Sequence, residues 1–461
     1  MTTQTLNAFP ISRTRRARRL LSFGLASLLL SHASLVRAQV GFEVGSNDQR
    51  ISDMGLDGVP SPESVSSVAV AYNPDKGQYL VVWIGSEGVC RQVFGQIIDA
   101  KSGHEVGAND FLIGNGIGDA SSLDVAYGDG EYLVAWNDED VYVQRLSAEG
   151  LELGVDDQVV NGDSLNLATS VSVAYDPSNR QYLLVWDDFR FDPIGAKTGQ
   201  IIGQLIDADT GAEIGVDDFS IGTGSPFGNQ YPAVAHNPST HEFFVVWKRT
   251  EFGIGSIRGQ RLDSASASPI GASEFQINSS TFPDQFWPRV VYAPSGNQYL
   301  VIWAANFEIL ARRVDGATGA PQAHSEFVVS KHVSIAFHPD VAFDSNASEY
   351  LIVFSAFGDL QALDPEIYAR RLAVRADEGN RPSFRISDMG SDGDVSVGPL
   401  GPSYGRLVGV AHSAARHEAL VVWWSDDEDL VVPGEFEVFG QRLMRGVLAS
   451  ESGRSPTRNN K

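Results

Sequence analysis

The chain has 461 residues, of which 43% are hydrophobic and 10% aromatic, so it is long enough to bury a large core. Its formal net charge of -24 at pH 7 argues against nucleic acid or an anionic membrane surface as a partner, because both would repel the protein. The 46 glycines indicate many turns rather than long helices. We therefore expect a globular protein that does not bind nucleic acid.

The first 38 residues have the order of a secretory signal peptide. The basic stretch "SRTRRARR" is followed by the apolar run "LLSFGLASLLLSHASLV" and by "VRA", which predicts cleavage after Ala38. The general secretory route fits better than twin-arginine export, because "RRLLSF" departs from the twin-arginine motif. No later apolar run is long enough to span a bilayer. We expect a secreted or periplasmic protein without membrane insertion.

Cys90 is the only cysteine, so neither an intramolecular disulfide nor a four-cysteine zinc site is possible. Its neighbours, "EGVCRQ", include no histidine that would activate it, so we interpret Cys90 as inert rather than as a nucleophile.

One short phrase recurs along most of the chain. It ends at seven positions, which are Trp83, Trp136, Trp186, Trp247, Trp303, Phe354 and Trp423, and it reads "YLVVW", "YLVAW", "YLLVW", "FFVVW", "YLVIW", "YLIVF" and "ALVVW". Successive copies end between 50 residues (Trp136 to Trp186) and 69 residues (Phe354 to Trp423) apart. A fixed core with connections of variable length indicates seven structural repeats.

Within the first repeat, the apolar segment "SVAVAY" (67 to 72) is followed by the turn "NPDKGQ", by "YLVVW", by "VFGQIIDA" (93 to 100) and by "FLIG" (111 to 114). This order predicts four strands, the first two joined as a hairpin. The second strand is continuously apolar, so both of its faces must be covered. The sequence predicts an all-β fold, a seven-bladed β-propeller of four-stranded blades, over residues 39 to 445.

The last repeat has "LVGVAH", "ALVVW" and "VFGQRLM" but no fourth strand after them. Near the N-terminus, "FEVGSNDQRIS" (42 to 52) aligns with "HEVGANDFLIG" (104 to 114), which is a fourth-strand segment. We therefore predict that the N-terminal strand completes the last blade and closes the ring. The repeated phrase "RISDMG", at 50 and at 385, would then mark the ends of two equivalent fourth strands.

The repeats resemble the "YLVVW…GQ" units of secreted bacterial β-propeller proteins, most of which have no assigned function. The pairs that carry this resemblance are Gly95-Gln96, Gly203-Gln204, Gly259-Gln260 and Gly440-Gln441, and the pairs that depart from it are Val143-Gln144, Ala311-Arg312 and Ala369-Arg370. The resemblance implies a fold and not an activity. Residues 446 to 461 are polar and basic, which predicts a flexible tail.

Residues that break the repeat are the candidates for function. Trp287 lies outside the repeat position, and it stands just before the first strand of its blade, as Tyr231 and His338 do in the adjacent blades. These three side chains would lie at one level near the channel mouth, where they suit stacking on a sugar or another ring. The alternative is that they plug the mouth or pack on a neighbouring loop. Trp424 is the other tryptophan outside the repeat position.

Acidic residues stand within three positions after the repeat tryptophan in three blades: Asp138, Asp187 with Asp188, and Asp426. Blade four instead carries Lys248-Arg249. Two carboxylates from different blades, brought within about 5 to 10 Å, would permit glycoside hydrolysis. They would equally suit a calcium ion, which takes several oxygen ligands. A third interpretation is that they are solvated loops of an acidic protein.

Two histidines occupy a position that the other repeats fill with tyrosine or phenylalanine. These are His236 and His412, and we predict that they are structural members of their first strands. The sequence carries no nucleophile elbow, phosphate loop or dinucleotide fingerprint.

These observations predict a binding or interaction module with its ligand on the channel-mouth face, carbohydrate being the candidate class. The predicted ligand-binding residues are Tyr231, Trp287, His338, Trp424, Asp138, Asp187, Asp188 and Asp426. A carbohydrate-active hydrolase or lyase and a structural scaffold are the alternatives. We expect a monomer whose partner is a polysaccharide or a protein at the cell envelope, with calcium as the one candidate cofactor.

Overall fold

The computed structural model describes residues 42–54, 65–86, 91–115, 120–162, 168–189, 199–222, 228–358, 365–375, 382–388, 406–426 and 436–445. The predicted signal peptide, Cys90 and the predicted tail lie outside these residues and stay predictions. The unit Phe42–Arg445 is the folded ring. No helix in the described part of the chain is long and apolar enough to cross a membrane.

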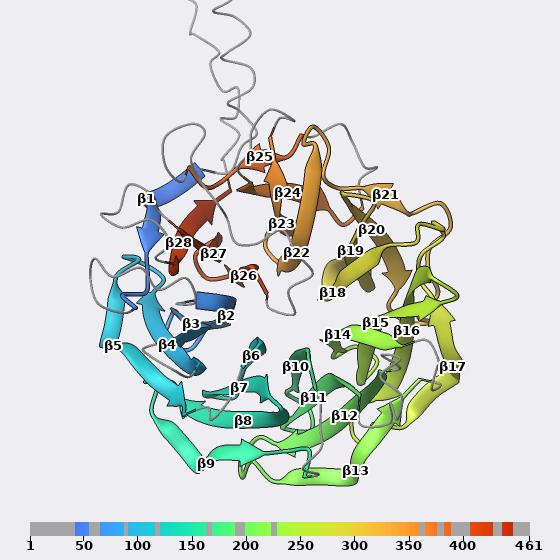
Figure 1. The fold of residues 1–461 in the computed structure, drawn as a ribbon, viewed down its shortest axis with the longest axis horizontal. Coiled ribbons are helices and arrows are strands. Elements are labelled where there is room, and N and C mark those ends of the chain that lie inside the picture. The colour runs from blue at the N-terminus through green and yellow to red at the C-terminus, as the bar shows by residue number, and fades with distance from the viewer. Residues whose placement is uncertain are drawn as a thin grey trace, which may run out of the picture. The chain divides into compact units, whose positions relative to one another are not determined.

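Seven four-stranded antiparallel sheets stand around a common axis, which confirms the predicted seven-bladed β-propeller (Figure 1). Blades one to three contain β2 (Val65–Asn73), β3 (Gln78–Ser86), β4 (Arg91–Asp99), β5 (Glu105–Gly114), β6 (Ser122–Gly128), β7 (Glu131–Asp138), β8 (Asp140–Ser147), β9 (Glu152–Val159), β10 (Val171–Asp176), β11 (Gln181–Asp188), β12 (Gln200–Asp207) and β13 (Glu213–Ile221). Blades four and five contain β14 (Asn229–Asn237), β15 (Glu242–Glu251), β16 (Ile254–Asp263), β17 (Pro269–Gln276), β18 (Gln285–Ala293), the short 3-10 helix η1 (Pro294–Gly296), β19 (Gln298–Ala305), β20 (Glu308–Asp315) and β21 (Phe327–Val328). Blades six and seven contain β22 (Ile335–Asp344), β23 (Glu349–Phe357), β24 (Glu366–Ala373), β25 (Phe384–Arg385), β26 (Val408–Ser413), β27 (Glu418–Asp426), β28 (Phe436–Met444) and, from the N-terminus, β1 (Phe42–Arg50).

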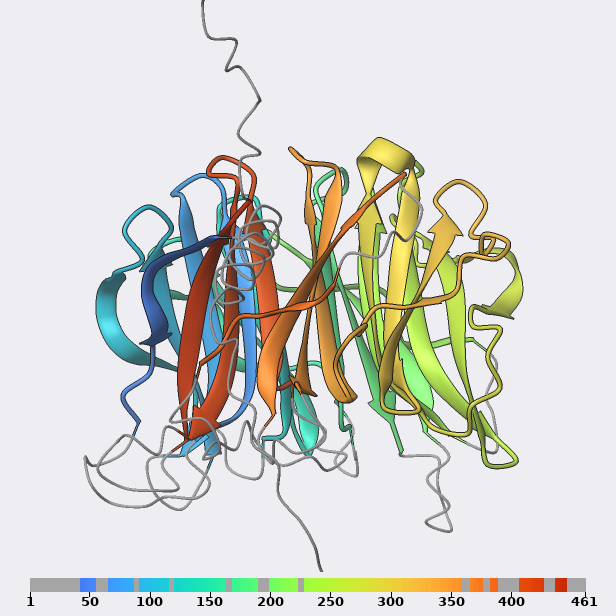
Figure 2. The same cartoon turned by 90° about the horizontal axis from the view of Figure 1, so that it is seen from above.

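The first two strands of a blade form the predicted hairpin. In blade one, the Asn73 side chain accepts hydrogen bonds from the backbone N–H groups of Asp75 and Lys76, at 2.9 and 3.0 Å. Gly77 then turns the chain with a φ of +64°. This is the Asx-turn chemistry that "NPDKG" indicates. The hairpins lie on the face that is uppermost in Figure 2, where η1 is also visible.

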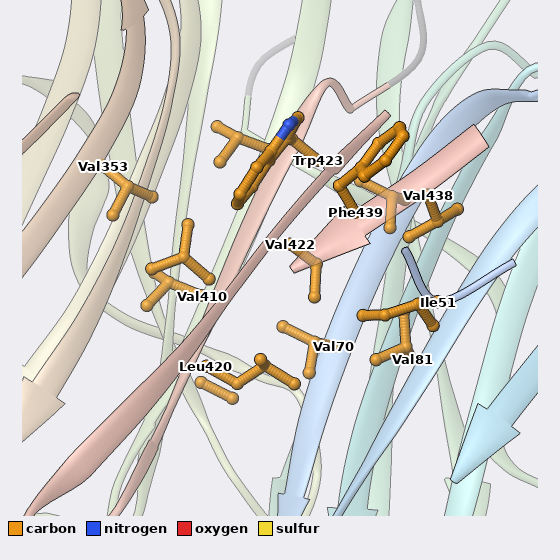
Figure 3. Packing of buried hydrophobic residues seen from close by; sticks show 14 of the residues in the cluster. Ile51, Val70, Val81, Val353, Val410, Leu420, Val422, Trp423, Val438 and Phe439 are labelled. Atoms are coloured by element: carbon orange, nitrogen blue, oxygen red, sulfur yellow. The ribbon is translucent and has the colours of Figure 1, made fainter. Parts of the chain in front are cut away.

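The second strands form the core, as their continuous apolar sequence predicts. All six repeat tryptophans and Phe354 are no more than 1% exposed. Figure 3 shows how blade seven packs: Trp423, Val422 and Leu420 of β27 lie among Val410 of β26, Val70 and Val81 of blade one and Val353 of blade six. Each blade therefore buries both faces against its neighbours, which contributes most of the stability of the fold.

The Gly-Gln pair has a structural role in the outer half of the blade. The Gln96 side chain accepts a hydrogen bond from the backbone N–H of Asp110 at 3.0 Å, and Asp110 has a φ of +45° inside a bulge of β5. A Cβ atom at Gly95 would lie 2.7 Å from the Ile113 side chain. Gly95 thus leaves room for the outer strand, and Gln96 holds Asp110 in its left-handed conformation. Aspartate is one of the few non-glycine residues that adopt this conformation readily.

The same aspartates connect neighbouring blades. The Asp110 carboxylate accepts the N–H of Asp53, at 2.7 Å, and the Asp48 carboxylate accepts the N–H of Asp388, at 2.8 Å. Asp157 accepts the N–H of Asn115 at 3.0 Å in the same way. We call Asp48, Asp110 and Asp157 the outer clasps, because each one ties its fourth strand to the end of the preceding fourth strand.

The N-terminal strand closes the ring as predicted, because β1 pairs with β28 of blade seven. The Ser52 hydroxyl accepts the N–H of Val438 at 2.7 Å, and the buried Glu437 carboxylate accepts from Arg50 at 2.6 Å and from the Met54 N–H at 2.9 Å. In blade six, Ser387 accepts the N–H of Ile367 at 2.7 Å. In its described part, residues 50–52 and 385–387, the repeated phrase therefore makes the same serine contact to the third strand in both blades.

The two Ala-Arg pairs, which replace Gly-Gln in blades five and six, tie blades together. Arg312 donates to the Ile277 carbonyl of blade four at 2.5 Å. Arg370 donates to the Val328 and Val329 carbonyls of blade five, at 2.9 and 2.8 Å. Their blades have outer strands of only two residues, β21 and β25, so the long arginine side chains take over a contact that full outer strands make elsewhere.

Candidate aromatic pocket on the loop face

The loops that join strand two to strand three, and those that join strand four to the next strand one, share one side of the ring, which we call the loop face. It is the lower side in Figure 2. Its described parts include the turns at 252–253 and 306–307 and the segment 278–284. The predicted site residues lie at this side of the ring, at the beginnings of first strands and the ends of second strands.

The structure brings Tyr231, Trp287 and His338 together in one row across blades four, five and six. The Trp287 and His338 rings stack with centroids 4.1 Å apart, and Tyr231 lies 6.2 Å from Trp287. Their exposed fractions are 5%, 6% and 5%, so the row is packed rather than an open platform. Burial lowers the pKa of His338 to about 3, helped by the Arg289 charge, which keeps the imidazole neutral at physiological pH. Ligand contact by these residues stays a prediction.

A bulge in each first strand produces the row. Each of the three residues has a positive φ and precedes a proline, in Tyr231-Pro232, Trp287-Pro288 and His338-Pro339, and the pairing register shifts at each point. Proline has no N–H for the ladder, so it favours a bulge at the start of a strand. The proline that follows all three residues was the sequence signal for this geometry.

Trp424 does not join the row. It is 4% exposed, packs edge-on against Phe436 at 5.5 Å and belongs to the core around blade seven. Asp426 ends β27, and its side chain lies outside the described part of the structure.

The predicted acidic residues of blades two and three are internal. Asp187 is fully buried, and its carboxylate accepts hydrogen bonds from the Thr169 hydroxyl at 3.0 Å and the Ser170 N–H at 2.7 Å. Burial raises the pKa of Asp187 to about 6. Asp188 accepts from the indole of Trp186 at 3.2 Å, and Asp138 is 5% exposed. No group of three or more acidic, histidine or cysteine side chains in the described ranges is arranged to hold a metal ion.

The two strand histidines pair with aspartates of the preceding blade. His236 lies 3.1 Å from the Asp176 carboxylate, and His412 lies 3.4 Å from Asp344. Both imidazoles are nearly covered, which agrees with the structural role that their repeat position indicates.

A pocket of about 280 Å³ opens between blades five and six on the loop face. Its lining residues are Asp284, Phe286, Trp287, Ala304, Ala305, Asn306, Phe307 and Phe337. Phe307 and Phe337 meet edge to face, with centroids 5.9 Å apart and planes at 88°. The Trp287 indole N–H has no hydrogen-bond partner among the described residues. The pocket therefore offers apolar walls with a few polar groups, which is the usual composition of a small-ligand site.

Phe307 is held at the rim of this pocket in an unfavourable backbone conformation. The turn between β19 and β20 consists of Asn306 and Phe307, with φ values of +51° and +63°. A turn with two positive φ values favours Asn-Gly, because glycine adopts the second position without strain. A phenylalanine there costs about 1 to 2 kcal/mol, yet its side chain is 59% exposed. Only part of the ring is covered, by the edge-to-face contact with Phe337, so burial offsets little of that cost, which points to a role outside the fold.

Lys248 lies beside the pocket. Its ammonium is 3.9 Å from the centroid of Phe286, which lines the pocket, and 5.7 Å from the centroid of Tyr231. Burial lowers the pKa of Lys248 to about 8, against the attraction of Asp284. The neighbouring Arg249, by contrast, is paired with Glu274 at 2.7 Å.

Charged side chains cross the inside of the ring near the same level. Arg406, just before β26, contacts Asp124 of β6 at 3.0 Å, although blade one lies between their blades. Asp124 also accepts the N–H of Val173 at 3.1 Å. Arg289 lies 3.9 Å from Asp340, whose carboxylate accepts the N–H of Val410 at 2.9 Å. These four charges join blades two, three, five, six and seven through the interior of the ring.

Sequence reasoning identified Trp287 and the basic pair but missed Phe286, Phe307 and Phe337. The signal available for Phe307 was its place after Asn306, where a two-residue turn favours glycine.

No protein-family model matches the chain, and no curated protein matches it. Solved structures do match. The phage phi92 endosialidase aligns with 92% of this chain and 72% of its own, at a TM-score of 0.51 and 9% identity. Chaetomium thermophilum Raptor aligns with 89% of this chain and 29% of its own, at a TM-score of 0.50 and 10% identity. An alpha-L-arabinanase of Penicillium chrysogenum aligns with 72% of this chain and 98% of its own, at a TM-score of 0.46 and 12% identity. At these identities the comparisons show a likeness in fold alone, and no family is assigned.

Proposed function

We propose that this protein is a binding module whose ligand occupies the aromatic pocket between blades five and six. The observation that carries the proposal is Phe307, an exposed ring kept at a strained turn position on the rim of a pocket that Phe286, Trp287 and Phe337 also line. A strained aromatic residue that stays largely exposed and lines a pocket, as Phe307 does and Phe252 does not, is best explained by contact with a ligand there.

A neutral sugar ring is the ligand class that this pocket supports. Sugar rings present apolar C–H faces to aromatic walls and hydroxyls at their edges, and here Asn306 and Asp284 are the polar residues that line the pocket. The chain's charge of -24 and the Asp284 carboxylate disfavour an anionic ligand. A volume of about 280 Å³ suits one sugar unit, for instance within a polysaccharide.

The hydrolase alternative finds less support. Glycoside hydrolysis uses two carboxyl groups that flank the scissile bond. Asp284 is the one carboxylate among the described residues that line the pocket, while Asp187 and Asp188 are internal and bonded within the fold. Binding without turnover is therefore the function that we propose.

Affinity electrophoresis through gels that contain different polysaccharides tests the proposal. The wild-type protein should be retarded by at least one neutral polymer, and the Phe307→Gly variant should lose at least tenfold in affinity for it, because removal of one stacking ring costs about 1.4 kcal/mol or more. Because glycine suits the turn, this variant should unfold no earlier than the wild type.

Phe252→Ala is the matched control. Phe252 occupies the corresponding turn of blade four and is 85% exposed, but it does not line the pocket. Equal losses of affinity in both variants, or full affinity in Phe307→Gly, would refute the pocket as the site.

A further inference from the structure

Lys248 is a buried amine in an aromatic setting, and its environment departs from that of the neighbouring cations Arg249 and Arg261. The residue is 7% exposed, and the groups that face its ammonium are the rings of Phe286 and Tyr231. No carboxylate in the described ranges forms an ion pair with it, and Asp284 acts on it only at longer range. Buried cations are normally paired, since an unpaired buried charge is costly.

Two neighbouring cations are paired with carboxylates. Arg249, the next residue, is buried and donates to Asn229 at 3.0 Å and to Glu274 at 2.7 Å. Arg261 of the adjacent strand β16 is part-buried and donates to Glu242 at 2.6 Å. An arginine at position 248 would stay charged at any physiological pH, whereas a lysine can release its proton when burial disfavours the charge.

We propose that Lys248 is a reactive amine that captures aldehydes as an imine beside the aromatic pocket. The neutral amine attacks the carbonyl carbon, the carbonyl oxygen leaves as water after proton transfer from nitrogen, and a C=N bond replaces the C=O bond. The reaction consumes no oxidant or reductant. The protonated imine carries the same positive charge as the ammonium, and the face of Phe286, 3.9 Å from Nζ, is placed to stabilise it.

Two features of the site support this chemistry. A pKa of about 8 leaves about a fifth of Lys248 unprotonated at pH 7.4, against about one in a thousand for an exposed lysine. Phe286 also lines the pocket of about 280 Å³, so an apolar group carried by the aldehyde has an adjacent cavity to enter. The substrate class is therefore an aldehyde with an apolar substituent, and the inference does not depend on sugar binding by the pocket.

Reductive trapping on the intact protein tests the proposal. The protein is incubated at pH 7.4 with a limiting amount of benzaldehyde and with cyanoborohydride, which converts an imine to a stable benzylamine, and the modified lysines are mapped by mass spectrometry of peptides. Lys248 should be modified at least tenfold faster than Lys76 and Lys101, which are exposed. Its labelling rate should level off above about pH 8, while the rates of the exposed lysines continue to rise.

The Lys248→Arg variant keeps the positive charge and cannot form an imine, so the label on this peptide should disappear while Lys76 and Lys101 are modified as before. Equal labelling of all lysines in the wild type would overturn the proposal, because Lys248 would then have no special reactivity. Absence of label at Lys248 in the folded protein, with label appearing only in urea, would also overturn it, because the amine would be inaccessible.

Discussion

The outer clasps should make this protein less stable as the pH rises from 4 to 7. Burial raises the pKa of Asp48 and of Asp110 from an ordinary value of 3.8 to about 6, and a nearby acid adds to the effect in each case. Below pH 3.8 these groups are protonated in both the folded and the unfolded chain. Between pH 4 and 6 the unfolded chain releases its protons first, so the free energy of unfolding falls. Above pH 6 both carboxyls are ionised in the folded state too, and the decrease in the free energy of unfolding is complete.

The size of the penalty follows from the two pKa values. A difference between 3.8 and about 6 corresponds to about 3 kcal/mol, which solvent screening reduces to about 1 kcal/mol for each part-buried side chain. Asparagine cannot ionise, tolerates a positive φ and keeps an oxygen that accepts the N–H of Asp388 or Asp53. Asp48→Asn/Asp110→Asn should therefore gain about 2 kcal/mol at pH 8 and nothing at pH 4.

Scanning calorimetry at pH 4, 6 and 8 measures this effect. For a unit that spans Phe42–Arg445, a gain of 2 kcal/mol raises the Tm by about 2 °C. Asp156→Asn is the control, because it removes the same charge from an exposed side chain. If the double variant gains no more at pH 8 than at pH 4, or no more than the control, the clasps do not carry a buried charge and the reasoning is wrong.

Two further predictions concern the ring itself. Arg406→Met should lower the free energy of unfolding, measured in urea, by about 3 kcal/mol, because Asp124 and Asp340 lose the positive charge of Arg406 that joins distant blades. The added change Asp124→Asn should recover part of that loss. A loss no larger than that caused by replacing an exposed arginine would contradict this prediction. Ser52→Ala and Ser387→Ala should each lower the free energy of unfolding by about 1 to 2 kcal/mol, since each hydroxyl accepts the N–H of a third-strand residue at 2.7 Å. Clearly unequal losses in the two variants would show that the two copies of "RISDMG" are not equivalent.

The ring could be predicted from sequence because its signals repeat. Seven copies of the phrase that ends at Trp83 and its equivalents specify the buried second strands, and the alignment of 42 to 52 with 104 to 114 specifies the closing strand β1. These features depend on local pattern and on packing common to all blades, so one blade is evidence for the next. The roles of Gln96 and Arg370 were not predicted, because each depends on a contact between segments that the repeat pattern does not place.

The site was predicted only in part. Tyr231, Trp287 and His338 were placed at one level because they share a repeat position, and the structure brings them together. Their burial was not predictable from position alone, because it depends on a bulge that turns each ring against its neighbour. The pocket combines Phe286 and Phe337, from the beginnings of two first strands, with Phe307 from a turn, and no spacing in the sequence relates them.

The irregular features of the ring fall in adjacent blades. Blades four, five and six carry the bulges before proline, and blades five and six carry Ala-Arg in place of Gly-Gln and have outer strands of two residues. The pocket and Lys248 lie in these same blades. Packing between blades is the demand that all seven share, and it accounts for positions that every blade fills alike. Departures that cost backbone strain or a buried unpaired charge need a different cause. Three of these departures, the bulge at Trp287, the strained Phe307 and the buried Lys248, adjoin one pocket, which agrees with the ligand site that we propose there.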